Sequence, residues 1–190
     1  MKKIITCLLT LSMMFMFSAT AFASDFSGNA ESELSNISDK IVTAVNDVYS
    51  DKNISITAED INYDSAFKIY VDTNVFKLST NVAGEIENAL ENGNYIYLLP
   101  IDTVNGTVVV NFQKGLPLSE NAKAILSEEE QQEVLDNAGK WVISSLALYK
   151  NGNSNYDYEK KLSSIIDEIP ADTILVGGLP IFQDVVALIP

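Results

Sequence analysis

The stretch YIYLLPIDTVNGTVVVNFQ, residues 95–113, predicts a β-hairpin. Both of its runs are rich in β-branched and aromatic residues, and Asn105-Gly106 is a pair favoured in two-residue type I′ turns. With these two residues as the turn, Leu99 pairs with Phe112 and Ile101 with Val110. Alternation then places seven large side chains on one face of the hairpin, which we expect to be buried: Tyr95, Tyr97, Leu99, Ile101, Val108, Val110 and Phe112.

The opposite face of this hairpin is more polar and includes Pro100 and Asp102. Proline has no N–H to donate to a strand ladder, so Pro100 predicts either an edge position or a β-bulge.

Helices and strands are predicted on the N-terminal side of the hairpin. Apolar residues recur at helical spacing over residues 31–50, which predicts an amphipathic helix. Residues 54–61 form a weak strand candidate and residues 66–71 a better one. Asn81 can cap a short helix that Gly93 ends.

A second group of elements follows the hairpin. Ser127 and Glu130 form a capping box that predicts the start of a helix, and Gly139 predicts its end before a strand at residues 141–149. One continuous helix through Gly139 is the alternative. Residues 158–169 predict another helix that stops at Pro170, and two apolar strands close the chain at residues 174–176 and 185–189.

These elements predict an α+β fold with helices packed on antiparallel sheet. Gly115-Leu116-Pro117 divides the chain into residues 24–115 and 116–190, as one compact domain or a tandem pair. The two ranges share an approximate α-β-α-β-β order. A duplication and an unrelated pair of α+β units both account for that order.

Residues 1–23 have the pattern of a cleaved export signal. Lys2 and Lys3 precede an apolar run from Ile4 to Phe17, and Ala21-Phe22-Ala23 fits a signal peptidase site. The run is too short to span a bilayer, and Cys7 lies at its start rather than at the end where a lipidated cysteine belongs. The sequence therefore predicts a secreted bacterial protein without a stable membrane anchor.

The composition excludes several classes of site. The chain has no His and no Arg, and its single Cys and all four Met lie within residues 1–23. Removal of those residues also removes two lysines and changes the net charge from −14 to −16. A mature chain of this composition has no catalytic His or Cys and no imidazole or thiolate metal ligand, so we expect no cofactor and no metal. Its charge also disfavours binding to nucleic acid.

Three residues are the candidate binding residues: Asp102, Tyr156 and Tyr158. Asp102 lies on the polar hairpin face, and the two tyrosines flank a polar loop, so these side chains have the chemistry to contact a ligand. The oxygen-rich run Asn151–Glu159 resembles the start of a calcium loop, but Gly and Glu are missing from the later positions that such a loop requires. A solvated turn followed by a helix cap explains the run better.

Three functions fit these exclusions. The first is a non-catalytic module that binds an unknown protein or glycan at the cell envelope or outside the cell. The second is a small carboxylate-dependent hydrolase, because a glycosidase needs only two acids at a set separation. The third is a structural or inhibitory domain. We assign no catalytic residue.

We predict that the exported protein begins at Ser24. Mass spectrometry of the secreted material should give the mass of residues 24–190, because the signal peptidase cleaves after Ala23. An intact Met1, or a lipid attached to Cys7 in the membrane fraction, would contradict this prediction.

Overall fold

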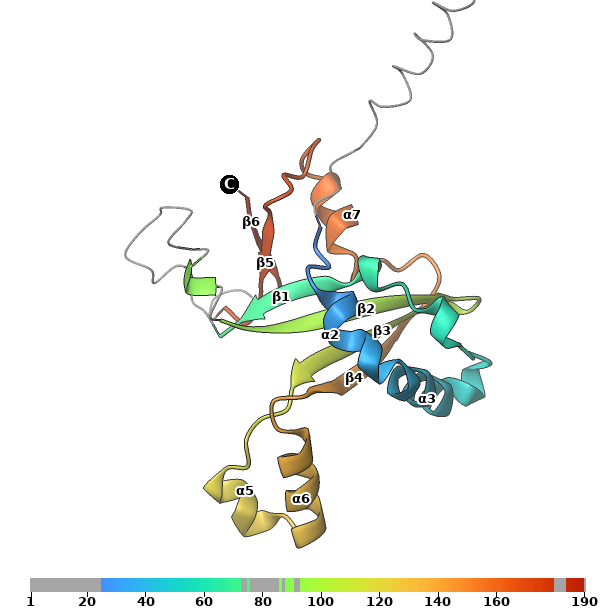
Figure 1. Ribbon diagram of the computed structural model, residues 1–190. Helices are drawn as coiled ribbons and strands as arrows, with labels where there is room; N and C mark the ends of the chain where they lie inside the picture. The colour runs from blue at the N-terminus through green and yellow to red at the C-terminus, as the bar shows by residue number, and fades with distance from the viewer. Residues whose placement is uncertain are drawn as a thin grey trace, which may run out of the picture.

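A six-stranded mixed sheet, mostly antiparallel, forms the centre of the computed structural model, and helices pack against it (Figure 1). The structure describes residues 25–72, 75, 86, 88–90, 93–179 and 184–189. The strand order is β4-β3-β2-β1-β5-β6, with every pair antiparallel except β1 and β5. The predicted α+β class is confirmed.

Two helices cover one face of the sheet. α2 (Ala30–Leu34) and α3 (Ser38–Tyr49) are joined by the 3₁₀ turn Ser35–Ile37, which interrupts the single helix predicted over residues 31–50. The predicted apolar stripe packs inward, because Leu34, Ile41 and Val45 are fully buried. They pack on the predicted apolar face of the hairpin, whose side chains from Tyr97 to Phe112 are also buried.

The hairpin itself forms with a register different from the predicted one. β2 (Asn94–Thr103) and β3 (Gly106–Lys114) pair Leu99 with Val110 and Ile101 with Val108. The turn residues are therefore Val104 and Asn105, not Asn105-Gly106. Neither has a positive φ, so the turn is not type I′. Because the register differs by two residues, every side chain keeps its predicted face.

Gly106 lies in β3 because β4 (Trp141–Tyr149) approaches it closely. A Cβ at Gly106 would lie 2.3 Å from the Tyr149 carbonyl oxygen, and its φ is +139°. The glycine is thus required by a strand that follows more than thirty residues later in the sequence, which the local pattern does not reveal.

Pro100 is in a central strand but has a strand partner on one side only. It pairs with Val109 of β3, whereas β1 (Phe67–Val71) begins opposite Leu98. The predicted edge position is therefore wrong for the strand as a whole, although β1 does not extend to Pro100.

β4 is an edge strand with a bulge, and it confirms the predicted break before residue 141. Gly139 has a φ of +71° after α6 (Glu128–Asn137), as expected at a helix end. Asn111 pairs with Ser145 and Phe112 with Ile143, which leaves Ser144 as the extra residue.

The other face of the sheet is covered near β1 by the C-terminal part of the chain. Phe67 and Ile69 pack with Phe26 and Leu175, and Tyr158 of α7 (Tyr158–Ser163) lies against them. β5 (Ile174–Val176) and β6 (Val186–Leu188) complete the sheet, which confirms the two predicted C-terminal strands.

Two predicted elements differ from the structure. Residues 54–61 are not a strand, because Asn46 satisfies the Ile56 backbone: Ile56 N–H donates to Asn46 Oδ1 (2.8 Å) and Asn46 Nδ2 donates to the Ile56 carbonyl (3.0 Å). The helix predicted over residues 158–169 ends at Ser163, where the Ser163 hydroxyl donates to the Glu159 carbonyl (2.7 Å). Most of the helix predicted between Asn81 and Gly93 lies outside the described residues, although Ile86 and residues 88–90 are helical.

Both sequence ranges contribute to the same sheet. Residues 24–115 supply β1, β2 and β3, whereas residues 116–190 supply β4, β5 and β6, and β1 pairs directly with β5. The strand arrangement does not confirm a duplication.

One carboxylate joins the helical layer to the sheet. Glu33 of α2 accepts hydrogen bonds from the hydroxyl of Tyr95 (2.9 Å), the hydroxyl of Tyr97 (3.3 Å) and Nε1 of Trp141 (2.9 Å). Burial raises the pKa of Tyr95 to about 12, and the hydrogen bond to Glu33 adds to this effect. Burial and the Glu33 charge also raise the pKa of Tyr97. We call these four residues the Glu33 clamp.

We predict that Gly106→Ala destabilises the protein strongly. The added methyl meets the Tyr149 carbonyl at a positive φ, which should lower the free energy of unfolding by about 3 kcal/mol. Urea denaturation followed by Trp141 fluorescence measures the change. Gly152→Ala is the matched control, because Gly152 also has a positive φ (+87°) but no atom within 4 Å of the added carbon. Equal losses in the two variants would contradict the close-approach argument.

We also predict that stability falls as the pH rises from 10 to 12. The unfolded tyrosine loses its proton near pH 10, whereas folded Tyr95 retains it to about pH 12, so the folded state holds more protons in this range. Urea unfolding at pH 9, 10 and 11 measures the slope. Tyr95→Phe should reduce the slope, and an unchanged slope would show that the clamp does not control it.

Candidate binding surfaces

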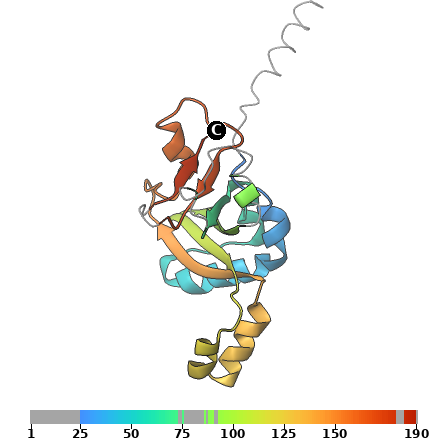
Figure 2. The same ribbon diagram turned by 90° about the vertical axis from the view of Figure 1, so that its left-hand side faces the viewer.

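A helical hairpin projects from the end of β3 and β4 (Figures 1 and 2). It consists of α5 (Glu120–Ile125) and α6 within residues 116–140, which we call the arm. Both views place it away from the sheet and from the other helices. Neither α5 nor α6 has a buried residue.

Local hydrogen bonds hold the arm together. Ser119 Oγ caps α5 by accepting from the Ala122 N–H (3.1 Å), and Ser127 with Glu130 forms the predicted capping box of α6. These bonds from Ser127 lower the pKa of Glu130. Gln131 Nε2 donates to the Leu126 carbonyl (2.8 Å) and to the Lys123 carbonyl (3.1 Å), which fixes the turn between the helices.

The base of the arm is closed by backbone contacts. Gly115 N–H donates to the Lys140 carbonyl (2.9 Å), and Gly139 N–H donates to the Gly115 carbonyl (2.8 Å). A Cβ on Gly115 would lie 2.1 Å from the Asn137 carbonyl oxygen, so glycine is required for this approach. The arm is thus anchored at one end only.

The arm is both acidic and apolar on its surface. Residues 116–140 carry six carboxylates and two lysines, and Lys123 pairs with Glu120 (2.7 Å). Among the large apolar side chains, Ile125 is 82% exposed, Leu116 73% and Leu135 52%. Water therefore covers apolar groups that a partner could bury.

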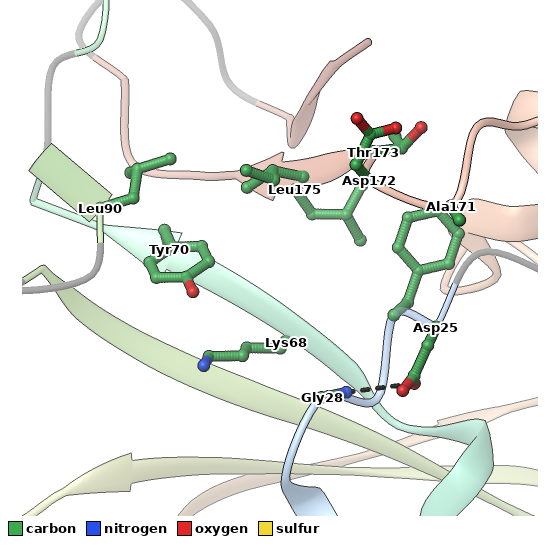
Figure 3. A pocket seen from close by; sticks show the side chains of 11 residues that line it. Asp25, Gly28, Lys68, Tyr70, Leu90, Ala171, Asp172, Thr173 and Leu175 are labelled. Carbon is green, nitrogen blue, oxygen red and sulfur yellow. Dashed lines mark hydrogen bonds between the residues drawn. The ribbon is translucent and has the colours of Figure 1, made fainter. Parts of the chain in front are cut away.

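A second candidate surface is an open cavity of about 340 Å³ beside β1. It lies between the segment that precedes α2, β1 and the segment that leads into β5 (Figure 3). Its lining combines one lysine, two aspartates and apolar side chains: Asp25, Phe26, Gly28, Lys68, Tyr70, Leu90, Ala171, Asp172, Thr173, Ile174 and Leu175.

The structure links two of the three predicted binding residues and separates the third. Tyr156 donates to Thr107 Oγ1 (2.9 Å), and Thr107 donates to Asp102 Oδ1 (2.6 Å), so these residues form one chain beside the hairpin turn. Tyr158 instead packs edge-on against Phe67, with ring centroids 5.4 Å apart. Burial raises the pKa of Tyr158 to about 12.

Asp102 lines an open depression of about 460 Å³ near the hairpin turn, where a carboxylate-dependent hydrolase would need a second acid. Asp60 lines the same depression. The Thr57 backbone N–H and hydroxyl both donate to Asp60 (2.7 and 2.9 Å), and these bonds lower its pKa. A general acid requires a raised pKa, so Asp60 is unsuited to that role.

The oxygen-rich run at residues 151–159 is occupied by turn and cap interactions. Asn153 Oδ1 accepts from the Asn155 N–H (3.1 Å), and Asp157 Oδ1 accepts from the Lys160 N–H (2.8 Å) at the start of α7. Within the described ranges, no group of three carboxylate, imidazole or thiol side chains is arranged to hold a metal ion. No described helix is both long enough and apolar enough to span a membrane.

The sequence interpretation missed α5 and Lys68. Ser119, which caps α5, was the available signal for the first helix of the arm. For Lys68, the available signal was a charged residue within the otherwise apolar or aromatic strand FKIYV of β1.

No family model, curated protein or solved structure matches this chain.

Proposed function

We propose that this chain is a non-catalytic binding module of a secreted bacterial protein, acting at the cell envelope or outside the cell, and that the arm is its recognition element. The observation that carries the proposal is an ordered helical hairpin that projects from the sheet with no buried residue in either helix.

The arm lacks the packing that normally stabilises short helices. α5 has six residues and α6 has ten, and isolated helices of this length are marginal in water. Caps and the Gln131 bonds fix their ends, but the most apolar burial in the two helices is the half-buried Ala122 and Val134. A partner that covers Ile125 and Leu135 would supply further burial, because interface energy concentrates on a few buried side chains.

The charge of the arm defines the partner's chemistry. Its carboxylates outnumber its lysines by six to two, and the whole chain carries −14. A protein surface that combines apolar residues with lysine or arginine complements the arm and is attracted to it at moderate ionic strength. We therefore favour a basic protein partner over a glycan.

The proposal predicts that Ile125→Ser weakens partner binding at least tenfold. The mature protein is used to isolate its partner from the producer's envelope and secreted fractions, and the purified partner is then titrated against each variant. Loss of one exposed apolar contact that becomes buried in the complex accounts for a change of this size.

Ile165→Ser is the matched control, because Ile165 is 78% exposed and lies outside the arm. It should leave binding unchanged, and both variants should unfold at the same temperature as the parent protein. If the Ile125→Ser and Leu135→Ser variants bound the partner as tightly as the parent protein does, the proposal would be contradicted. Turnover of a glycan or peptide that Asp102→Asn abolishes would contradict it too.

A further inference from the structure

The cavity beside β1 has a basic end and an acidic end. Figure 3 shows Lys68 and Tyr70 extending from β1, with the Lys68 ammonium group turned away from Asp25. Asp25 and Asp172 lie on the other side of the cavity, on separate segments, and their carboxylates point away from each other. A volume of about 340 Å³ is sufficient for a small ligand.

The basic end is held in place by packing. A Cβ on Gly28 would lie 3.1 Å from Lys68 Cδ, so the missing side chain leaves room for the lysine stem. Lys68 Nζ then lies 4.1 Å from the ring centroid of Tyr95 and 5.1 Å from that of Tyr70. Lys68 forms no ion pair with any residue in the described part of the chain, and a ligand carboxylate can therefore approach it.

The acidic end consists of one fixed and one exposed carboxylate. Asp25 Oδ1 accepts from the Ser27 N–H (3.0 Å), the Ser27 hydroxyl (2.6 Å) and the Gly28 N–H (3.2 Å), which orients the side chain. Asp172 is exposed at the segment that leads into β5. The exposed Asp172 carboxylate is therefore the one that favours a cationic group of the ligand.

Apolar side chains separate the two ends. Tyr70, Leu90 and Leu175 line the cavity, and the two leucines are almost completely buried. A ligand that fits this arrangement has a positive group at one end, a negative group at the other and an apolar part between them. A short peptide with free termini has this charge pattern, because its ammonium and carboxylate are separated by about 3.4 Å of chain per residue.

We propose that this cavity binds short apolar peptides by their free ends, with the peptide carboxylate at Lys68 and the peptide ammonium at Asp172. The cavity does not include the arm, although Lys114, at the end of β3 from which the arm projects, lies over the same Tyr95 ring as Lys68 (5.3 and 4.1 Å from Nζ to the ring centroid). It gives the module a small-molecule site in addition to a protein-binding surface.

The test uses the tripeptide Leu-Ala-Leu with free ends, and the same peptide acetylated at its N-terminus or amidated at its C-terminus. Calorimetric titration of residues 24–190 should show binding of the free peptide and a loss of about tenfold with each modification. Amide chemical shifts of Lys68, Tyr70 and Leu175 should move during the titration, whereas those of the arm should not.

Two variants test which end binds where. Lys68→Met retains a stem that packs on Gly28, and it should remove the effect of C-terminal amidation while the effect of acetylation remains. Asp172→Asn should reduce the effect of acetylation only. Lys150→Gln is the control. Lys150 is exposed and follows Tyr149 at the C-terminal end of β4, and it is not part of the cavity lining.

Several outcomes would overturn the proposal. One is the absence of binding at millimolar peptide, and another is equal binding of the free and modified peptides, which would exclude recognition of the ends. A retained amidation effect in Lys68→Met would place the carboxylate elsewhere. If Lys68→Met does not fold, the comparison of free and modified peptides decides the question alone. None of these results depends on Ile125, so failure of this proposal is distinguishable from failure of the proposed arm function.

Discussion

The carboxylate of Glu33 is the constraint on which the architecture depends. A half-buried carboxylate is costly unless donors replace its water, and Tyr95, Tyr97 and Trp141 supply them from β2 and β4. These bonds orient α2 over the sheet. They also fix the Tyr95 ring, over which the Lys68 ammonium lies. One charge thus connects the helical layer, the edge strand that follows the arm and the basic end of the cavity.

The two proposed surfaces differ in how they can bind. The arm presents separate apolar side chains among carboxylates on a projecting element, which suits a large surface that wraps around it. The cavity is open to solvent, and its lining has Lys68 on one side and Asp172 on the other. Attraction to the arm should depend strongly on ionic strength, whereas a peptide with no net charge is affected less by the overall charge of −14.

Local patterns predicted much of the fold because side-chain alternation and helix capping depend on residues only a few positions apart. Alternation identified the buried face of the hairpin, and the Ser127 capping box located α6. Long-range contacts were not predictable in this way. The close approach of Tyr149 to Gly106 joins residues 43 positions apart, and Glu33 receives its donors from 62 to 108 residues further along the chain. Among the candidate binding residues, Asp102 and Tyr156 are distant in the sequence. The fold connects them through hydrogen bonds to Thr107, which the sequence pattern did not reveal.

The closed base of the arm makes it an exchangeable insertion. Because Gly115 and Lys140 are already hydrogen-bonded to each other, the ends of β3 and β4 are close enough for a tight turn to join them. Residues between these two positions can therefore vary in length and chemistry without altering the sheet register. Evolution or design could graft a different recognition hairpin onto the same scaffold and keep the Glu33 clamp intact.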